Sequence, residues 1–241
     1  WIEKRARLAQ ITIAIDGPAA SGKSTIGERI ADALGYLYFD TGVMYRAVTW
    51  AALDRGIAIA DEPAITDLAE RLDIQVEPPS VDDGRQYTVR ADGVDITWSI
   101  RDAAVNRKVS PVSAYRGVRA ALTAQQRRIG LRGAVVMVGR DIGSVVLPEA
   151  ELKVFLDASL HERARRRFVE SVGRGTEVRF EDVVADLARR DEIDSSREVA
   201  PLSQAKGAVY LDTTRLDVDQ VVGAILDLVA DRTSRGEYAK A

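Results

Sequence analysis

Residues 11–25 read Ile11-Thr-Ile-Ala-Ile-Asp16-Gly17-Pro-Ala-Ala-Ser-Gly22-Lys23-Ser24-Thr25, an apolar run followed by G-x-x-x-x-G-K-S and then by a helical pattern. This strand–loop–helix context is typical of a phosphate-binding P-loop. Gly17 and Gly22 allow a tight turn with no Cβ in the way of a phosphate, so that successive N–H groups can point inward. The helix that begins there also directs its positive dipole end at the loop. The stretch therefore predicts a site for the phosphates of a nucleotide.

Two side chains of this loop carry chemistry. Lys23 can reach the β- and γ-phosphates, and the Ser24 hydroxyl can bind Mg²⁺. A chance match in an ordinary glycine-containing loop is the alternative, which the full motif and its context disfavour. The residues predicted to bind ATP and its Mg²⁺ are Gly17, Pro18, Ala19, Ala20, Ser21, Gly22, Lys23, Ser24 and Thr25.

Composition excludes several classes of protein. The chain has 241 residues, no cysteine, a net charge of −3 and a pI near 5.4. Without cysteine there is no disulfide, thiolate or Cys–zinc chemistry, and the acidic balance argues against bulk binding to nucleic acid or an anionic membrane. The sequence has no apolar run of ~18 residues and no signal-peptide pattern. We expect a cytoplasmic protein with neither a nucleic-acid nor a membrane partner, and a monomer.

Apolar runs and helical patterns alternate along most of the chain. Such alternation predicts an α/β fold, in which a mostly parallel sheet carries helices on both faces and binds ligands beyond the carboxyl ends of its strands. Residues 1–10 precede the first strand and are expected to be a linker, a trimmed end or the remnant of a longer chain. The expected strands are 11–15, 36–39, 134–138, 153–156 and 208–211, and the expected helices are 24–34, 43–53, 118–129, 160–172, 181–190 and 218–229.

One stretch, about residues 60–100, departs from this alternation. Three short runs at 72–77, 85–90 and 94–97 are separated by Asp83-Gly84 and Asp92-Gly93. An Asp-Gly pair between apolar runs is typical of a β-hairpin. The stretch therefore predicts a small antiparallel β meander inserted into the α/β core.

A second anion site is predicted after the second strand. The segment Asp40-Thr-Gly-Val-Met-Tyr-Arg46 puts Thr41 where it can cap a helix, with Tyr45 and Arg46 one turn inside. An arginine near a helix start suits a phosphate, and two phosphate sites are what phosphoryl transfer between two nucleotides requires. The alternative is a capped amphipathic helix with a surface arginine.

Between Ser159 and Arg197 every basic residue except His161 is an arginine. Arginine binds phosphate bidentately and stays charged, which suits a segment that closes over phosphates. A solvated helical surface paired with acidic residues is the alternative for about half of these arginines. The single histidine, His161, is expected to be a surface residue. The arginines are Arg163, Arg165, Arg166, Arg167, Arg174, Arg179, Arg189, Arg190 and Arg197.

Taken together, these motifs resemble those of the bacterial cytidylate kinases, a family of P-loop nucleoside monophosphate kinases. The resemblance extends along nearly all of the chain and includes the inserted meander. The P-loop alone fits many activities, whereas its combination with D-[ST]-G-x-x-Y-R and G-R-D-x-G is far narrower. The segments that carry it are 15–24, 40–46, 109–119, 139–143, 155–158, 162–166, 190–194 and 197–202. One departure is Val138, which stands where the family often has an acidic residue.

The resemblance implies a fold and an activity. It implies a three-layer α/β/α P-loop core with a five-stranded parallel sheet, the β meander in a monophosphate-binding region, and a helical lid. It implies transfer of the ATP γ-phosphoryl group to CMP or dCMP in pyrimidine nucleotide metabolism, with ATP and Mg²⁺ as cofactors. The single kinase unit 1–241 would then divide into a core (11–44, 102–157, 205–235), a monophosphate-binding region (45–101) and a lid region (158–197).

The resemblance also implies roles for individual residues. Catalytic roles fall to Lys23, Arg163, Arg166 and Arg190, with Ser24 as the protein ligand of Mg²⁺. The implied CMP-binding residues are Thr41, Tyr45, Arg46, Ser110, Arg119, Arg140, Asp141, Arg190, Asp194 and Arg197.

Elementary chemistry supports the base assignment. A carboxylate at Asp141 can accept a hydrogen bond from the cytosine amino group, while Arg119 and Ser110 can donate to the ring acceptors. The alternative for Asp141 is a structural N-cap. Arg190, Asp194 and Arg197 are spaced four and three residues apart, so on a helix they are expected to share one face. The alternative for Asp194 and Arg197 is an ion pair within that helix.

Other activities fit fewer of the motifs. A P-loop kinase for a metabolite such as shikimate or dephospho-coenzyme A would not explain the segments at 40–46 and 139–141. A GTP switch would need an Asn-Lys-x-Asp motif, but Asn106, the only asparagine, is followed by Arg107. A translocase would be expected to show a basic or aromatic track along the chain.

Overall fold

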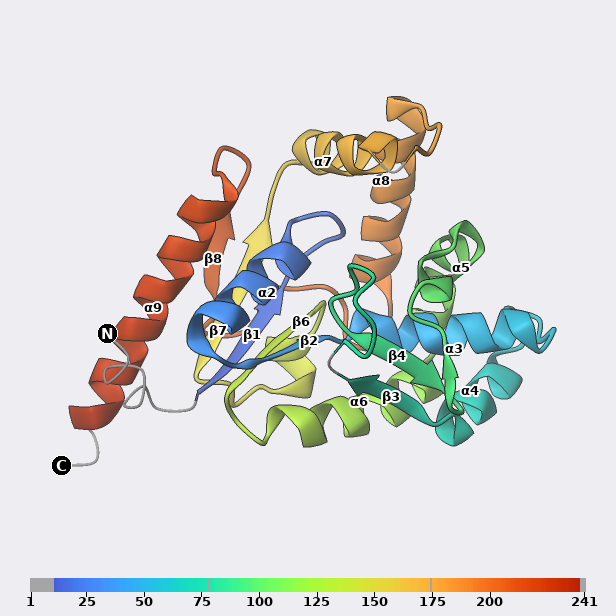
Figure 1. Cartoon of the computed structure of the whole chain (residues 1–241), viewed down its shortest axis with the longest axis horizontal. Coiled ribbons are helices and arrows are strands. Elements are labelled where there is room, and N and C mark those ends of the chain that lie inside the picture. The colour runs from blue at the N-terminus through green and yellow to red at the C-terminus, as the bar shows by residue number, and fades with distance from the viewer. Residues whose placement is uncertain (1–10, 78, 174, 239–241) are drawn as a thin grey trace. The chain divides into compact units, whose positions relative to one another are not determined.

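Five parallel strands form the main sheet of the computed structural model, which describes residues 11–77, 79–173 and 175–238 (Figure 1). They are β1 (Thr12–Asp16), β2 (Leu37–Asp40), β6 (Val135–Gly139), β7 (Leu152–Asp157) and β8 (Val209–Asp212), in the order β2-β6-β1-β7-β8. Each lies within two residues of its predicted bounds. The register pairs Asp16, the last residue of β1, with Gly139, the last residue of β6, and with Phe155, two residues before the end of β7.

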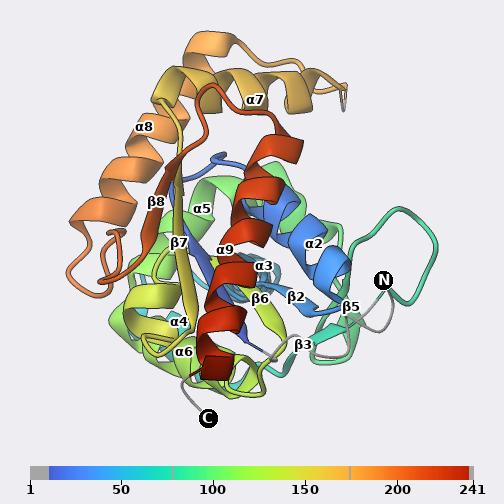
Figure 2. The ribbon, with the colours of Figure 1, turned by 90° about the vertical axis from the view of Figure 1, so that its left-hand side faces the viewer.

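The chain divides into two compact units, and the sheet belongs to the first, which comprises residues up to 40, 127–196 and from 200 onward. Its helices are α2 (Lys23–Leu34), α7 (Leu160–Gly173), α8 (Phe180–Ser196), α9 (Val218–Tyr238) and the π-helix η2 (Ile142–Val146). In Figure 2, α2 and α9 lie side by side over one face of the sheet. Their apolar residues, such as Ile30 and Ile225, pack with Ile13 and Ile15 of β1 in one buried cluster. Val138 is buried in the same cluster, as an ordinary strand residue.

The second unit comprises residues 41–126 and 197–199. It contains α3 (Gly42–Asp54), α4 (Glu62–Arg71), η1 (Ser99–Arg101), α5 (Ala103–Ala114) and most of α6 (Arg116–Gly130). It also holds the antiparallel sheet β3 (Ile74–Glu77), β4 (Thr88–Ala91) and β5 (Val94–Asp95). The predicted meander is thus confirmed, and Asp92 and Gly93 take the positive φ angles of 48° and 81° that a tight hairpin requires.

Helices α4 and α5 were not predicted. The start of helix α4 is nevertheless marked in the sequence. The Asp61 side chain accepts a hydrogen bond from the Ala64 N–H, and a proline stands in the first turn. Helix α5 was obscured by Pro111 in its interior. The α/β class with an inserted β sheet is nevertheless confirmed. Residues 102–126 belong to the second unit.

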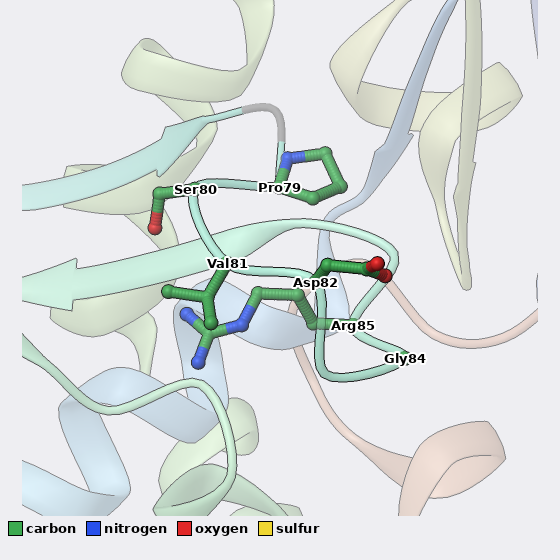
Figure 3. A pocket seen from close by; sticks show the side chains of 6 residues that line it. All are labelled: Pro79, Ser80, Val81, Asp82, Gly84 and Arg85. Atoms are coloured by element: carbon green, nitrogen blue, oxygen red, sulfur yellow. The ribbon is translucent and has the colours of Figure 1, made fainter.

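The long connection between β3 and β4 is anchored by Arg85. Its guanidinium donates to Asp83 at 2.7 Å, to Asp95 at 2.6 Å and to two threonine hydroxyls. These hydrogen bonds lower the pKa of Asp95 to about 2, Arg85 being the largest cause. Figure 3 shows an open pocket in this loop, in which the Arg85 side chain extends away from the Asp82 carboxylate.

Two expectations from the sequence concern residues that the structure does not describe. Residues 1–10 and Arg174 lie outside the described residues. Within the described part of the chain, no helix combines the length and apolar character needed to cross a bilayer.

Candidate functional site

The P-loop connects the end of β1 to the start of α2. Gly17, Ala20 and Gly22 all have positive φ, at 150°, 60° and 95°. A Cβ on Gly17 would lie 1.9 Å from the Leu156 carbonyl oxygen, so only glycine fits against β7 there. Gly22 occupies the N-cap of α2 and offers no side chain to its first N–H groups. Those groups are therefore oriented to bind an anion, as the motif predicts.

The Lys23 ammonium is folded back into this loop. Its Nζ donates to the Pro18 carbonyl oxygen at 2.5 Å and to Ser21 Oγ at 3.2 Å, and the residue is buried. Burial holds the pKa of Lys23 well below its usual value, and the nearby Arg140 cation acts in the same direction. A polyanion would relieve both effects, so this buried cation suits a phosphate ligand.

A pair of oxygen groups lies beside the start of α2. Ser24 Oγ donates to Asp40 Oδ2 at the end of β2 over 3.2 Å. Mg²⁺ prefers oxygen ligands and is usually bound by one or two protein groups together with phosphates and water. Among the described residues there is no cluster of three or more His, Cys, Asp or Glu side chains placed for a metal. Ser24 and Asp40 therefore fit a magnesium ion that a nucleotide brings with it, and do not form a complete metal site alone.

Asp16 lies at the centre of the strand ends and was assigned no role from the sequence. Its Oδ1 accepts from the Ile142 N–H at 2.7 Å and its Oδ2 from the Gly143 N–H at 2.8 Å. The side chain is 3% exposed, and burial raises its pKa to about 6. The only available signal was an acidic residue directly before the first glycine of the loop.

Arg140 and Asp141 follow β6, as predicted. Arg140 Nε donates to Asp194 Oδ2 of α8 at 2.8 Å, so two residues predicted to bind one substrate are in contact. Asp141 occupies the N-cap position of η2, but its side chain makes no cap hydrogen bond. The alternative interpretation of Asp141 as a structural N-cap is therefore wrong.

In helix α7, Arg163 lies against the P-loop. It is 5% exposed and donates to the carbonyl oxygens of Ala19 and Ala158 and to Asp191 Oδ2, the last at 2.6 Å. Together with Pro18, both residues of this ion pair line a pocket of about 230 Å³. Sequence reasoning missed Asp191, because nothing local links it to Arg163. The described contacts make Arg163 a support of the loop, and its predicted contact with phosphates stays a prediction.

Other arginines of α7 and α8 divide between two environments. Arg166 donates to Glu162 and to both Oγ1 and the carbonyl oxygen of Thr213 after β8. Surface ion pairs within one helix hold three others, which are Arg165 with Glu162, Arg167 with Glu170 and Arg189 with Asp186. The solvated-surface alternative is correct for those three. His161 is exposed, as expected, with its ring edge-on to Phe180.

The expectation that Arg190, Asp194 and Arg197 share one helix face is only partly correct. Helix α8 contains Arg190 and Asp194 but ends at Ser196. Arg197 lies beyond that end and groups with the second unit. The only sequence signal for the end of α8 before Arg197 is Pro201, four residues further on. The spacing of these residues therefore wrongly predicted that the helix would include Arg197.

The second unit brings together several predicted CMP-binding residues of its own. The Arg119 guanidinium lies over the Tyr45 ring at 5.4 Å from its centroid and donates to the Ser113 carbonyl oxygen at 3.0 Å. Arg46 Nη1 donates to Asn106 Oδ1 at 2.6 Å and to the Ile100 carbonyl oxygen at 3.0 Å. Its guanidinium is thus hydrogen-bonded to residues of η1 and α5. The alternative, a solvated arginine on the surface of the helix, does not describe it.

Two further predicted residues of this unit are buried. Ser110 of α5 is 4% exposed and Thr41 is 3% exposed. Thr41 occupies the N-cap position of α3, but its side chain makes no cap hydrogen bond. The predicted capping role of Thr41 is therefore wrong, and its role in substrate binding stays a prediction.

Comparison with known proteins gives a consistent result. The family model described as cytidylate kinase matches residues 13–231. A cytidylate kinase of Herpetosiphon aurantiacus is 50% identical over 218 residues, covering 90% of this chain and 93% of the relative. Those of Roseiflexus castenholzii and Bacillus subtilis are 48% and 43% identical, and the alignments cover 97% and 93% of this chain and 99% and 98% of the relatives.

Among solved structures, a gluconokinase from Sinorhizobium meliloti 1021 is similar in fold. It superposes with a TM-score of 0.51 at 16% identity, covering 96% of this chain and 98% of that one. At that identity the likeness concerns the fold alone, and it agrees with the P-loop kinase architecture predicted from the sequence.

Proposed function

Because the chain belongs to the cytidylate kinase family, we propose that it transfers the γ-phosphoryl group of ATP to CMP or dCMP, giving ADP and CDP or dCDP. One observation carries this proposal. In the first unit, β1 and β6 are adjacent parallel strands, so the P-loop with its buried Lys23 lies beside the loop that carries Arg140 and Asp141. The reaction belongs to pyrimidine nucleotide metabolism. We further propose a cytoplasmic monomer with no nucleic-acid or membrane partner.

The P-loop is the proposed site of the ATP phosphates. The backbone N–H groups of residues 17–22 and the start of α2 would surround them, and Lys23 would move its hydrogen bonds from Pro18 to the phosphate. Ser24 and Asp40 would hold Mg²⁺, which when bound neutralises charge on the transferring phosphate. Arg163 would hold the P-loop in place through its hydrogen bond to the Ala19 carbonyl oxygen. Arg166, which donates to Thr213 in the loop after β8, would be an arginine of the lid.

The proposed nucleophile is a phosphate oxygen of CMP. It is already ionised at neutral pH, so no general base is needed, and the mechanism requires positioning and charge stabilisation instead. Lys23, Arg166 and Arg190 are the proposed sources of that stabilisation. Closure of the α7–α8 region would exclude water and limit wasteful hydrolysis of ATP.

The base of CMP is proposed to be read by Asp141, Arg119 and Ser110. A carboxylate accepts from the cytosine amino group, whereas in UMP it would face a carbonyl oxygen. Leaving such buried groups unpaired costs on the order of 1–3 kcal/mol each. Tyr45 would hold the Arg119 guanidinium through the stacked contact already present.

Asp141→Asn should reduce the use of CMP and narrow the ratio between CMP and UMP. An asparagine amide can donate to the uracil carbonyl oxygen, which the carboxylate cannot. The measurement is kcat/KM for both nucleotides. Asp212→Asn, which changes another carboxylate at a strand end, is the matched control and should keep the parental ratio. An unchanged ratio in Asp141→Asn would mean that Asp141 does not read the base.

The phosphate and ribose of CMP are proposed to be bound by a set of arginines and one carboxylate. Arg140, Arg46 and Arg197 would contact the phosphate, together with Thr41. Arg190 and Asp194 would contact the ribose. Asp194 has a second function in this arrangement, because its hydrogen bond from Arg140 orients a phosphate-binding cation.

Asp194→Ala and Arg197→Ala should each weaken the use of CMP by about tenfold or more, because each removes a charge-assisted hydrogen bond. Arg197→Ala should affect CMP and dCMP alike, since a phosphate contact is common to both. The measurement is steady-state kinetics beside a melting curve. The control Asp186→Ala removes a surface ion pair on α8, the helix that carries Asp194, and should change neither the kinetics nor the melting temperature substantially. Parental kinetics in both variants would contradict the ribose and phosphate assignments.

The proposed function is tested directly by a coupled ADP-release assay. ATP is supplied with CMP, dCMP, UMP, AMP or GMP in turn, and the expected result is high kcat/KM for CMP and dCMP only. Equal turnover of AMP or GMP would contradict the proposal. Absence of turnover with every nucleotide, together with ATP turnover on a small hydroxylated metabolite, would favour a P-loop kinase of another specificity.

A further inference from the structure

The loop after β6 is held at both ends by one residue, Asp16. On one side, Asp16 is paired in register with Gly139, the last residue of β6. On the other side, its carboxylate accepts from the N–H groups of Ile142 and Gly143. Only Arg140 and Asp141 lie between these two attachments. The two side chains that the proposed function assigns to the phosphate and base of CMP are therefore carried on a span whose ends are both fixed to Asp16.

From this arrangement we propose that Asp16 is a positioning residue for CMP recognition: it touches no substrate but sets where Arg140 and Asp141 stand. The inference rests on the proposed function and adds a residue to which that function assigns no role.

The chemistry of the contact requires a carboxylate. Two consecutive N–H donors point at Asp16, and both carboxylate oxygens accept, at 2.7 and 2.8 Å. An asparagine offers one acceptor oxygen, and its NH₂ group would face the second N–H as donor against donor. No neutral side chain of similar size provides two acceptors in this geometry.

A buried carboxylate at Asp16 costs more free energy than a purely structural role would justify. The side chain is 3% exposed. The Asp141 carboxylate opposes its ionisation, and the Lys23 ammonium favours it. Burying a carboxylate costs free energy unless hydrogen bonds compensate. A small displacement of groups that bind substrate can lower the rate by ~10²-fold. Holding Arg140 and Asp141 in place through Ile142 and Gly143 therefore has a functional benefit.

The test uses Asp16→Asn in the full chain, with CMP, UMP and ATP as varied substrates. We expect the KM for CMP to rise about tenfold or more and the CMP-to-UMP ratio of kcat/KM to fall, because both hydrogen bonds of the Asp16 carboxylate hold the Arg140–Asp141 span. The KM for ATP should rise less than the KM for CMP, because these hydrogen bonds do not hold the P-loop. A uniform fall in kcat with unchanged KM values and ratio would overturn the inference.

Thr12→Val is the matched control. Thr12 lies at the other end of β1, where its buried Oγ1 donates to the Gly130 carbonyl oxygen at 3.1 Å. Valine is of similar shape and removes only that hydrogen bond. It should lower the melting temperature and leave both KM values and the CMP-to-UMP ratio unchanged. The same split between KM values in Thr12→Val would mean that general destabilisation produces the effect, and would overturn the role of Asp16.

Two further measurements cover failure of folding and failure of the proposed function. If Asp16→Asn does not fold, Asp16→Ala, which lacks the opposing NH₂ group, is measured in the same way. In the parental protein, hydrogen exchange at the Ile142 and Gly143 amides should be slow, and exchange as fast as in an unstructured peptide would overturn the clamp. Parental turnover of CMP is measured first: its absence contradicts the proposed function, whereas its presence with parental kinetics in the Asp16 variants contradicts only this inference.

Discussion

Lys23→Ala should keep the fold and lower kcat by roughly 10²–10³-fold, the cost of removing a comparable preorganised electrostatic contact. The ammonium is buried in the P-loop, donating to Pro18 and Ser21, so it lies within reach of any phosphate in the nest. Charge builds up on the transferring phosphate in the transition state, and alanine cannot stabilise it.

The stability of Lys23→Ala has a predictable sign. The folded protein holds the pKa of Lys23 below its unfolded value, so folding disfavours the charged form at neutral pH. Removing the cation also removes its repulsion with Arg140. We therefore expect a melting temperature equal to or above that of the parent.

The measurement is steady-state kinetics with ATP and CMP beside a thermal melt. Lys153→Ala is the matched control, because Lys153 likewise donates to a backbone carbonyl oxygen, that of Pro148 at 2.8 Å, but lies outside the P-loop. It should retain parental turnover. Near-parental turnover in Lys23→Ala would contradict the proposed role of this lysine.

Gly17→Ala should damage both stability and activity. Gly17 has φ +150°, and an added Cβ would lie 1.9 Å from the Leu156 carbonyl oxygen of β7, so the loop has to move away from the sheet. A positive φ costs an alanine roughly 1–2 kcal/mol and overpacking costs roughly 1–3 kcal/mol more. For a chain of this length each kcal/mol lowers the melting temperature by about 2–4 °C. The displaced nest should lower kcat/KM for ATP by ~10²-fold or more.

Gly35→Ala separates the two causes. Gly35 ends α2 at φ +70° and has no atom within 4 Å of an added Cβ, so its substitution adds backbone strain without overlap. Its melting temperature should fall by the smaller amount, and its kinetics should stay parental. If Gly17→Ala is no less stable than Gly35→Ala and remains active, the loop does not depend on close approach to β7.

Much of the fold was predictable because it rests on local patterns. Short apolar runs marked all five strands of the main sheet, and the hairpin at Asp92-Gly93 needed only its dipeptide. Helices α4 and α5 were missed for opposite reasons. The start signal of α4, Asp61 with a proline in the first turn, lay inside the stretch that was expected to be a β meander. Pro111 argued against a helix that tertiary packing nevertheless maintains.

The sequence could propose the candidate site as a set of residues, but it could not predict the contacts of those residues. The P-loop, Arg140 and Asp141 stand where their motifs placed them. The predicted capping by Thr41 and the common helix face of Arg197 were wrong, because helix ends and side-chain caps depend on what surrounds them. Arg163 was recognised as important, yet its described partners are the loop and Asp191.

The amino-acid sequence alone determined the glycine-containing loop that we propose binds phosphate, because glycine spacing, a lysine and a helix start are local properties of some nine consecutive residues. Only the tertiary structure decided the partners of its buried charges. Asp16 and Gly143 are 127 residues apart, and Arg163 and Ala19 are 144 apart. They meet because the sheet order sets β1 between β6 and β7. A buried charge takes whichever donors or acceptors the neighbouring strand ends supply, and strand order is a property of the whole packed chain.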